Sequence, residues 1–390
     1  MQKVVNRSGR ASGPYLSPKA RARQWWLKIH RWLGLTLLVP MALLGLTGSA
    51  LVWPSETELL LNPQRAVSAG ADPAQIEARH IAAATEGLSD HGAVTAALIG
   101  DVGQPMMFGT APVAGPYFGL GPPTRMAAYV DPESGELLDT KRSTGDFMWY
   151  MHAIHGHLLL SGVGRPVVGF MGLFLIVSAI TGLVIWWPGR KKINAALKWR
   201  RWEGKTLNIH RQSGVLLSLV LIIEAFTGAW ISFPTFFAGL VEPGSAQVEG
   251  EGPRSREAVA PGPAPIPPTL SALEWEEALA SAQSAYPGRP ASIQAPASAD
   301  GDWQFMLVGA RGPAEVLVPY GEGEVAIGYR ADSATRATRV SYAMDGIHAA
   351  SIGGPIWQWL TFLSGVFLAF LSFSGLYVWA KRKLSRGWQA

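Results

Sequence analysis

The stretch VVGFMGLFLIVSAITGLVIWW, Val167–Trp187, contains no charged side chain over 21 residues. A helix needs about 20 mostly apolar residues to cross the hydrocarbon layer of a bilayer. Three further stretches have a similar length and character: Leu33–Trp53, Val215–Phe233 and Ile356–Trp379. Tryptophans gather near the ends of these stretches, where their amphipathic rings favour the membrane interface. The sequence therefore predicts an integral membrane protein, mainly α-helical, with four transmembrane helices.

Charge predicts the orientation of these helices. The segment up to Arg31, the loop 189–211 and the tail after Ala380 hold 20 of the 33 lysines and arginines and only one of the 28 acids. Basic residues accumulate on the cytoplasmic side of membrane proteins. We therefore expect both termini in the cytoplasm, two large loops in the periplasm, and a multi-pass protein of a bacterial inner membrane. The net charge of +5 then reflects topology, and we expect no nucleic-acid partner.

These features divide the chain into nine expected segments. They are a cytoplasmic basic tail (1–32), a first span (33–54), a first periplasmic module (55–154), an outer histidine segment with the second span (155–188), a cytoplasmic loop (189–211), a third span (212–234), a second periplasmic module (235–347), an outer histidine segment with the fourth span (348–380) and a cytoplasmic tail (381–390).

Each periplasmic module is expected to be a small α+β unit. Helices are predicted at Asp72–Thr85, with Asp72 as N-cap and Pro73 at the first helical position, and at Ser271–Ser284. In the first module, AAYVDPESGELLDTKR (127–142) predicts two strands joined by a turn. In the second, strands are predicted at 303–308, 314–319 and 324–329.

The two halves of the chain repeat each other. IHRWLGL (29–35) matches IHRQSGV (209–215) 180 positions later, and WYMHAIH (149–155) matches YAMDGIH (342–348) at an offset of 193. Both halves run in the same direction, and such parallel repeats are related by an axis along the membrane normal. The sequence therefore predicts a four-helix bundle built from a parallel internal repeat.

The repeat pairs four of the eight histidines. His30 aligns with His210 at the inner end of the spans, and His155 aligns with His348 at the outer end. Two imidazoles facing each other across the axis suit the axial positions of a b-type haem, which predicts two non-covalent haems. No cysteine is present, which excludes disulfides, iron–sulfur clusters held by thiolates and covalent CxxCH attachment. The alternatives are histidines that only anchor the interface, or a zinc or copper site.

Other polar residues are candidates for supporting roles. An outer metal site could use His152, Asp345 and His155, because zinc usually has three or four ligands. His152, Asp345, Glu224 and Arg165 are candidates for contacting the ligands or handling protons. Glu224 lies within a span, where a carboxylate is costly and is by default a functional hypothesis; a protonated, purely structural Glu224 is the alternative.

Two further sets of polar residues receive structural interpretations. His157 aligns with Ala350 and is interpreted as interfacial. Four hydroxyl side chains in the spans are expected to bond backbone or neighbouring helices rather than to do chemistry. They are Thr47, Thr181, Thr227 and Ser374.

These motifs resemble the PepSY-associated transmembrane family. The resemblance rests on IHRWLGL, on HGHLLLSGVGRPVVGFMGLFLIVSAITGLVIWWPGR (155–190), on IHRQSGV with FTGAW, and on YVDPESGEL, which resembles a PepSY strand–turn–strand. Within this family the chain looks most like inner-membrane ferric-siderophore reductases of the ferrioxamine type, which are dihaem proteins. The resemblance implies haem ligation by His30 and His155 and electron transfer to a ferric siderophore.

The resemblance also leaves alternatives. A non-enzymatic PepSY-type scaffold or permease-associated binding protein would lack a chromophore. Tyr117 and Phe118, in the loop Pro112–Pro123, are candidate siderophore contacts. No dinucleotide-binding motif is present, and the loop 189–211 is too short for a flavin domain. A quinol or a separate reductase is therefore the expected electron donor.

Overall fold

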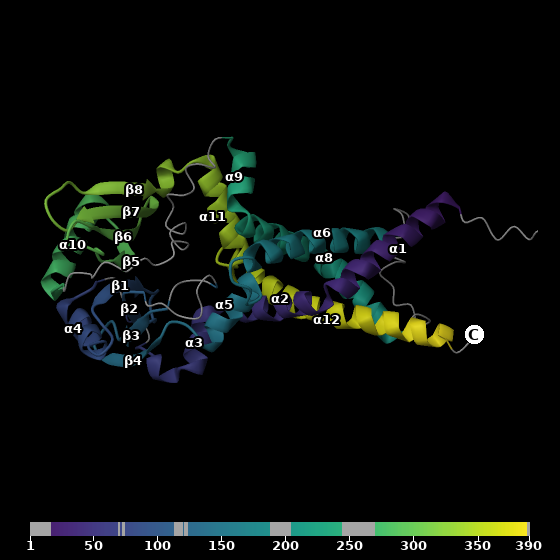
Figure 1. Ribbon diagram of the computed structural model, residues 1–390, viewed down its shortest axis with the longest axis horizontal. Helices are drawn as coiled ribbons and strands as arrows, with labels where there is room; N and C mark the ends of the chain where they lie inside the picture. The colour runs from purple at the N-terminus through teal and green to yellow at the C-terminus, as the bar shows by residue number, and fades with distance from the viewer. Residues whose placement is uncertain are drawn as a thin grey trace, which may run out of the picture.

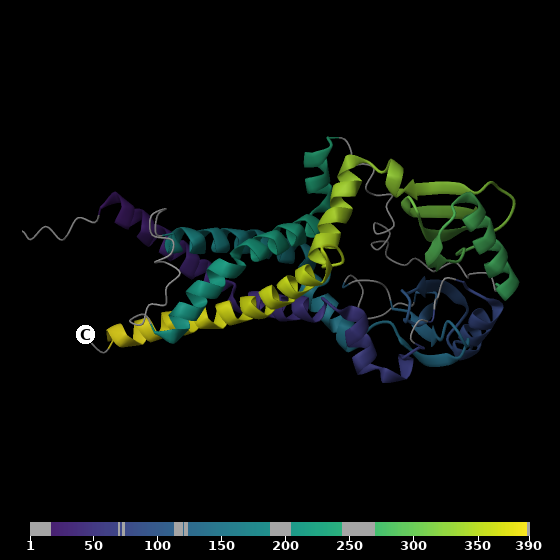
Figure 2. The same cartoon turned by 180° about the vertical axis from the view of Figure 1, so that it is seen from behind.

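The computed structural model describes residues 17–68, 71, 75–112, 120, 124–187, 204–243 and 270–387. Figure 1 shows an elongated molecule with a helical bundle at one end and a sheet with two helices at the other. The first helix and the C-terminus lie at the end of the bundle far from the sheet, as the view from behind in Figure 2 also shows. The bundle and the outer α+β domain are therefore separate regions along one long axis.

Within the described residues, three helices are long and apolar enough to cross a bilayer. They are α6 (Gly164–Trp186), α8 (Lys205–Ser232) and α12 (Gly354–Gly387). A fourth span exists if α1 (Pro18–Thr36) and α2 (Leu38–Ala50) are counted together. Close approach of small residues packs them: Gly45 of α2 lies against the backbone of Gly365 in α12, and Gly172 of α6 lies against the Ala225 carbonyl of α8.

The first span differs from the single straight helix that the sequence predicts over 33–54. α1 and α2 meet at Leu37 with a bend of 67°. Pro40 explains the break, because proline has no N–H to donate to the carbonyl of Thr36 and its ring crowds that carbonyl. In the last turn of α1, the Thr36 hydroxyl donates to the Trp32 carbonyl at 2.9 Å. The helix also extends back to Pro18, so part of the expected basic tail is helical.

Short helices follow or precede the spans at their outer ends. α3 (Pro54–Leu61) and α9 (Pro234–Val241) each begin with a proline directly after a span. α5 (Phe147–His157) and α11 (Arg336–His348) each lead into the next span. Their packing connects them to the bundle, since α5 contacts α2 and α6, and α11 contacts α8.

The outer domain contains one continuous eight-stranded sheet. Its strands are β1 (Val94–Ile99), β2 (Met106–Thr110), β3 (Met126–Val130), β4 (Leu137–Arg142), β5 (Arg289–Gln294), β6 (Asp302–Gly309), β7 (Gly312–Pro319) and β8 (Ala326–Arg330). The order across the sheet is β4-β3-β2-β1-β5-β6-β7-β8, and every neighbouring pair is antiparallel. Each half of the chain thus supplies four consecutive strands.

The two halves join where β1 pairs with β5. Ala96 lies opposite Gln294 and Ala97 opposite Ile293. α4 (Ala78–Gly87) and α10 (Ala272–Ala285) pack on the sheet and on each other, and one hydrophobic core runs through both halves. Trp275, Trp303 and Phe305 are at most 2% exposed in this core. The two modules expected from the sequence are therefore fused into a single domain.

The predicted elements of the outer domain differ from the structure in detail. α10 matches its prediction, and the Ser271 hydroxyl accepts from the Glu274 N–H as its N-cap. α4 begins at Ala78 with Glu77 as N-cap, whereas the predicted start at Asp72 and Pro73 lies outside the described residues. The sequence does not predict β1, β2 or β5: β1 and β2 are short runs with little alternation, and β5 mixes polar and apolar residues and contains Pro290.

A cluster of charged side chains ties the outer domain to the bundle. Arg65, in the 3-10 turn η1 (Pro63–Arg65) after α3, is 4% exposed. Its guanidinium contacts Glu58 of α3 at 2.9 Å and Asp139 of β4 at 2.6 Å, and it stacks over the Tyr129 ring. Burial raises the pKa of Tyr129 to about 12. Lys141 pairs with Asp146, which caps the N-terminus of α5.

Candidate functional site

Four histidines form two pairs at the two ends of the bundle. The inner pair is His30 of α1 and His210 of α8, with ring centroids 6.4 Å apart and ring planes at 77°. The outer pair is His155 of α5 and His348, the last residue of α11, with centroids 5.8 Å apart and planes at 40°. Residues separated by 180 and 193 positions in the sequence are thus brought side by side.

The outer histidines are held by the spans they face. Nδ1 of His155 lies 3.0 Å from the Leu44 carbonyl and 3.3 Å from the Thr47 hydroxyl. Nδ1 of His348 lies 3.1 Å from the Glu224 carbonyl and 3.1 Å from the Thr227 hydroxyl.

The inner histidines are held in the same way. Nδ1 of His30 lies 2.9 Å from the Ser178 carbonyl and 3.1 Å from the Thr181 hydroxyl. Nδ1 of His210 lies 2.8 Å from the Ser374 hydroxyl and also bonds the backbone of Leu371. All four contacts come from a different helix than the one that carries the histidine.

A hydroxyl–glycine motif therefore receives each ring: Thr47-Gly48, Thr181-Gly182, Thr227-Gly228 or Ser374-Gly375. The bonded carbonyl lies four residues before the glycine, and the hydroxyl directly before it. The glycine faces the ring edge. A Cβ built on each glycine would lie 2.7 Å (Gly48), 3.0 Å (Gly228), 3.2 Å (Gly182) or 3.6 Å (Gly375) from Cε1 of its histidine.

The hydrogen bonds determine which ring nitrogen carries the proton. The Thr47 hydroxyl donates to the Leu43 carbonyl at 2.7 Å, so its oxygen accepts from His155. Nδ1–H then donates to the carbonyl and the hydroxyl, and Nε2 keeps its lone pair. Burial, followed by the neighbouring His348, lowers the pKa of His155 to about 4, which keeps the ring neutral. A neutral imidazole with a bonded Nδ1–H is the usual form of a metal-ligating histidine.

His80 shows what a structural histidine looks like in the same chain. Its Nδ1 accepts from the Glu77 N–H at 3.0 Å, and its Nε2 lies 3.1 Å from the Pro132 carbonyl. Both nitrogens are therefore used within the protein. By contrast, no hydrogen bond to Nε2 is seen for any of the four paired histidines within the described part of the chain.

The inner pair opens into a large cavity. The cavity has a volume of about 990 Å³ and is lined by both inner histidines and by leucines of α1, α6, α8 and α12. Five cations also line it: Arg23, Arg31, Arg211, Arg382 and Lys383. Trp186 lines the same cavity, and its indole Nε1 is buried with no hydrogen-bond partner among the described residues. The cavity thus combines an apolar interior, two imidazoles and positive charge.

The predicted supporting residues have different environments. Glu224 lies at the outer pair, with Oε2 3.3 Å from Nδ1 of His348. His152 is exposed, and its Nδ1 lies 3.1 Å from the Met148 carbonyl of its own helix. Nδ1 of His157 is buried without a hydrogen-bond partner in the described structure, and Arg165 is exposed.

A zinc or copper site is not assembled at the outer face. Among the described residues, no group of three or more histidine, aspartate or glutamate side chains is placed to hold a metal ion. The alternative site of His152, Asp345 and His155 is therefore wrong for this arrangement. Asp345 instead lies on α11 one turn before His348, and its carbonyl accepts from the Ala349 N–H.

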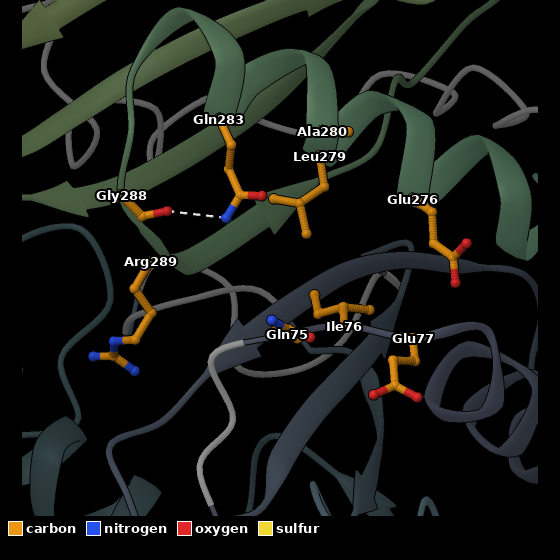
Figure 3. Close-up of a pocket in the computed structure, with 9 residues that line it drawn as sticks. All are labelled: Gln75, Ile76, Glu77, Glu276, Leu279, Ala280, Gln283, Gly288 and Arg289. Atoms are coloured by element: carbon orange, nitrogen blue, oxygen red, sulfur yellow. Dashed lines mark hydrogen bonds between the residues drawn. The ribbon is translucent and has the colours of Figure 1, made fainter.

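A groove of about 520 Å³ lies between α10 and residues 75–77, the segment just before α4, in the outer domain (Figure 3). Gln283 donates to the Gly288 carbonyl at 3.0 Å on one side, and Glu276 accepts from the Ala78 N–H at 2.7 Å. Arg289 is engaged with the Gly100 carbonyl and Asp101. Figure 1 places α4 and α10 at the end of the molecule away from the bundle, so this groove is remote from both histidine pairs.

Sequence reasoning missed the hydroxyl–glycine motifs as parts of the site. The structure shows that these hydroxyls bond their own helix, as expected, and also receive the histidines. The signal was present, because a threonine or serine before a glycine occurs in each of the four predicted spans, at Thr47, Thr181, Thr227 and Ser374, with a second such pair, Ser364-Gly365, in the fourth.

A protein-family model covers most of the chain. No curated protein sequence is significantly similar to the chain. The family model of the PepSY-associated TM region matches residues 27–382, which include all four paired histidines and both halves of the sheet. This protein is a multi-pass membrane protein and belongs to the PepSY-associated TM family.

Proposed function

We propose that the protein is an inner-membrane haem-b reductase that passes electrons across the membrane to ferric siderophores in the periplasm, releasing ferrous iron. The observation that carries this proposal is the set of four histidines, each with Nδ1 bonded by a hydroxyl–glycine motif and Nε2 left without a partner in the described structure. We also propose that the bundle is a parallel internal repeat and that each half of the sheet domain is a PepSY-like module.

The donor set fits two bis-histidine haems. A metal–imidazole bond is about 2 Å long, and the ring centre lies roughly 1 Å further, so two axial imidazoles on one metal have centres about 6 Å apart. The two pairs are separated by 6.4 and 5.8 Å. Zinc usually takes three or four protein ligands, whereas each end of this bundle offers two imidazoles. The pairing therefore favours haem over a simple metal ion.

The chain's own residues explain how such a group would be held. At the inner site, His30 and His210 would be the axial ligands, and the cavity walls would cover the macrocycle. Arginines pair well with carboxylates, so Arg23, Arg31 and Arg382 are suited to the propionates. At the outer site, His155 and His348 would be the ligands. When bound, each haem supplies a one-electron redox couple, while the protein sets its position and electrostatic surroundings.

The positions of the two pairs suit transmembrane electron transfer. They lie at opposite ends of a bundle that spans a hydrocarbon layer about 30 Å thick, so one long electron jump is divided into shorter ones. The positive-inside pattern supports a cytoplasmic position for the inner pair, where a quinol or a separate reductase would deliver electrons.

Ferric siderophore is the substrate that this arrangement would reduce on the periplasmic side. Hydroxamate and catecholate oxygens grip the hard ferric ion, and they hold the softer ferrous ion less tightly, so one-electron reduction releases the metal. The site of contact must lie near the outer histidines. The groove between α10 and residues 75–77 is too remote, and the predicted contacts Tyr117 and Phe118 lie outside the described residues.

An optical spectrum of the purified protein tests the proposal. We expect a Soret band, resolved α-bands on reduction, and two haems per chain by pyridine haemochrome. His30→Ala and His155→Ala should each remove one component, while the exposed His152→Ala should remove none. A folded but colourless protein would support the rival function, a non-enzymatic PepSY scaffold or permease-associated protein. Reoxidation by ferric hydroxamate, followed at the α-band, then tests the substrate.

A further inference from the structure

Beside the outer pair lies a carboxylate, that of Glu224, which has no counterpart beside the other three histidines. At each motif the residue four positions before the glycine offers its carbonyl to Nδ1: Leu44, Ser178, Glu224 or Leu371. Of these four, Glu224 alone has a carboxylate. The backbone and the side chain of Glu224 therefore both reach the same histidine nitrogen, at 3.1 and 3.3 Å.

The Glu224 side chain is fixed from two sides. Oε2 faces Nδ1 of His348 on α11, and Oε1 accepts from the Thr361 hydroxyl on α12 at 2.9 Å. The carboxyl is thus held between the helix that carries the ligand and the fourth span. Its position inside the protein, 14% exposed, keeps the interaction from being screened by water.

We propose that Glu224 is a positioning residue whose carboxylate, with Oε2 3.3 Å from Nδ1 of His348, lowers the reduction potential of the outer haem. A carboxylate beside the bonded Nδ1–H polarises the N–H bond and makes Nε2 a stronger electron donor. A more electron-rich axial ligand stabilises ferric iron over ferrous iron. This inference rests on the proposed function, because it needs the outer pair to bind haem.

The consequence is an asymmetry between two sites built from the same parts. The outer site becomes the stronger reductant of the two, which is the property required of the site that faces a tightly chelated ferric substrate. The inner site has no carboxylate at the equivalent position, since Ser178 and Leu371 stand there. The two sites are built from the same repeated motif, and the glutamate at position 224, where the other three motifs have leucine or serine, makes them different.

Spectroelectrochemical titration of the purified holoprotein tests this assignment. In Glu224→Gln we expect the outer component, identified as the one lost in His155→Ala, to favour ferrous iron at least tenfold more than in wild type. Tenfold corresponds to about 59 mV for a one-electron couple. The inner component should not move. Glu242→Gln is the matched control. The Glu242 carboxylate accepts from the Ala337 N–H at the start of α11, so this substitution removes the same charge without touching His348.

Thr361→Val provides a second variant if Glu224→Gln does not fold. Removing the hydroxyl releases Oε1, so the outer potential should rise in the same direction by a smaller amount. An outer potential unchanged in both variants, or a rise of similar size in Glu242→Gln, overturns the inference. A protein without haem overturns both proposals. A shifted outer potential in a protein that reduces no ferric chelate supports the role of Glu224 and contradicts the proposed function.

Discussion

The inner and outer histidine pairs are held by the same motif but are carried by different elements. The inner histidines lie on α1 and on the span α8. The outer histidines lie on the short helices α5 and α11, which follow the last strand that each half contributes to the sheet. The inner site therefore depends on the bundle alone, whereas the outer site depends on the bundle and the domain above it.

This difference separates two tasks within one repeated design. The hydroxyl–glycine motif holds the ring and selects its tautomer at both ends, so it accounts for ligand geometry. The surroundings differ: cations line the inner cavity, and a carboxylate contacts the outer pair. The repeated motif thus sets the orientation of the histidine rings, and the residues that differ between the two ends set the charge around them.

The largest expected effect comes from cutting the tie between the outer domain and the bundle. Arg65→Ala removes the buried cation that the Glu58 and Asp139 carboxylates share, leaving Glu58 only the longer contact with Lys141 at 3.6 Å, and breaking a buried ion pair costs about 3–5 kcal/mol. Hydrogen exchange should increase in α5 and β4, and the outer haem component should be weakened while the inner one persists. Arg79→Ala is the control, because its pair with Glu77 is about half exposed. Equal loss of the outer and inner haem components would contradict the conclusion that only the outer site depends on the sheet domain.

A smaller effect is expected from filling the space beside the rings. Gly48→Ala places a methyl where Cε1 of His155 lies 2.7 Å away, and such overpacking costs about 1–3 kcal/mol. The outer component should shift toward a five-coordinate, high-spin spectrum. Gly375→Ala is the matched change at the inner site, where the distance is 3.6 Å and an ordinary contact results. An inner site disturbed as strongly as the outer one would contradict the steric series.

Removing one hydroxyl should cost less still, and equally at both ends. Thr47→Val and Thr181→Val keep the side-chain shape and delete the acceptor for Nδ1–H, which is worth about 1 kcal/mol. Each variant should weaken haem retention at its own site by roughly fivefold, measured by transfer to apomyoglobin. Val39→Thr is a control for the substitution itself, since Val39 is 61% exposed on α2. A large effect at one end only would show that the motif is not equivalent in the two halves.

The smallest effect concerns His80, the structural histidine outside both pairs. Burial, the main cause, lowers the pKa of His80 below its usual 6.5, so the folded state resists protonation more than the unfolded chain does. The stability contributed by His80 is present above pH 6.5 and is lost as the pH falls below that value. The melting temperature of the outer domain should therefore fall between pH 7.5 and pH 5.5. It should fall less steeply in His80→Gln. An identical pH slope in the variant would contradict this origin.

The pairing of the site residues could be predicted from the sequence because a repeat places equivalent residues around one axis. His30 with His210 and His155 with His348 needed only the two offsets. The role of Thr47 and its equivalents was missed because a hydroxyl in a membrane helix usually bonds its own backbone, and the Thr47 hydroxyl does that as well.

Two features of the fold were beyond local sequence reasoning. The bend at Leu37 depends on Pro40, which was read as part of an uninterrupted apolar run. The fusion of the two modules depends on β1 pairing with β5 across almost 200 residues of chain, and no local pattern reports such a contact. Apolar runs short enough to be strands were also ambiguous between strand and loop.

The β1–β5 pairing has a consequence for the order in which the chain can be assembled. Ala96 can pair with Gln294 only after the two membrane helices that separate them in the chain, α6 and α8, have been synthesised. Until then β1 is an open edge strand, which is a template for mispairing with other chains. Long-range pairing of this kind also forms slowly. Biogenesis, more than the finished structure, is therefore the stage at which this protein is most vulnerable to aggregation, and chaperones that bind open strand edges should matter most between synthesis of the two halves.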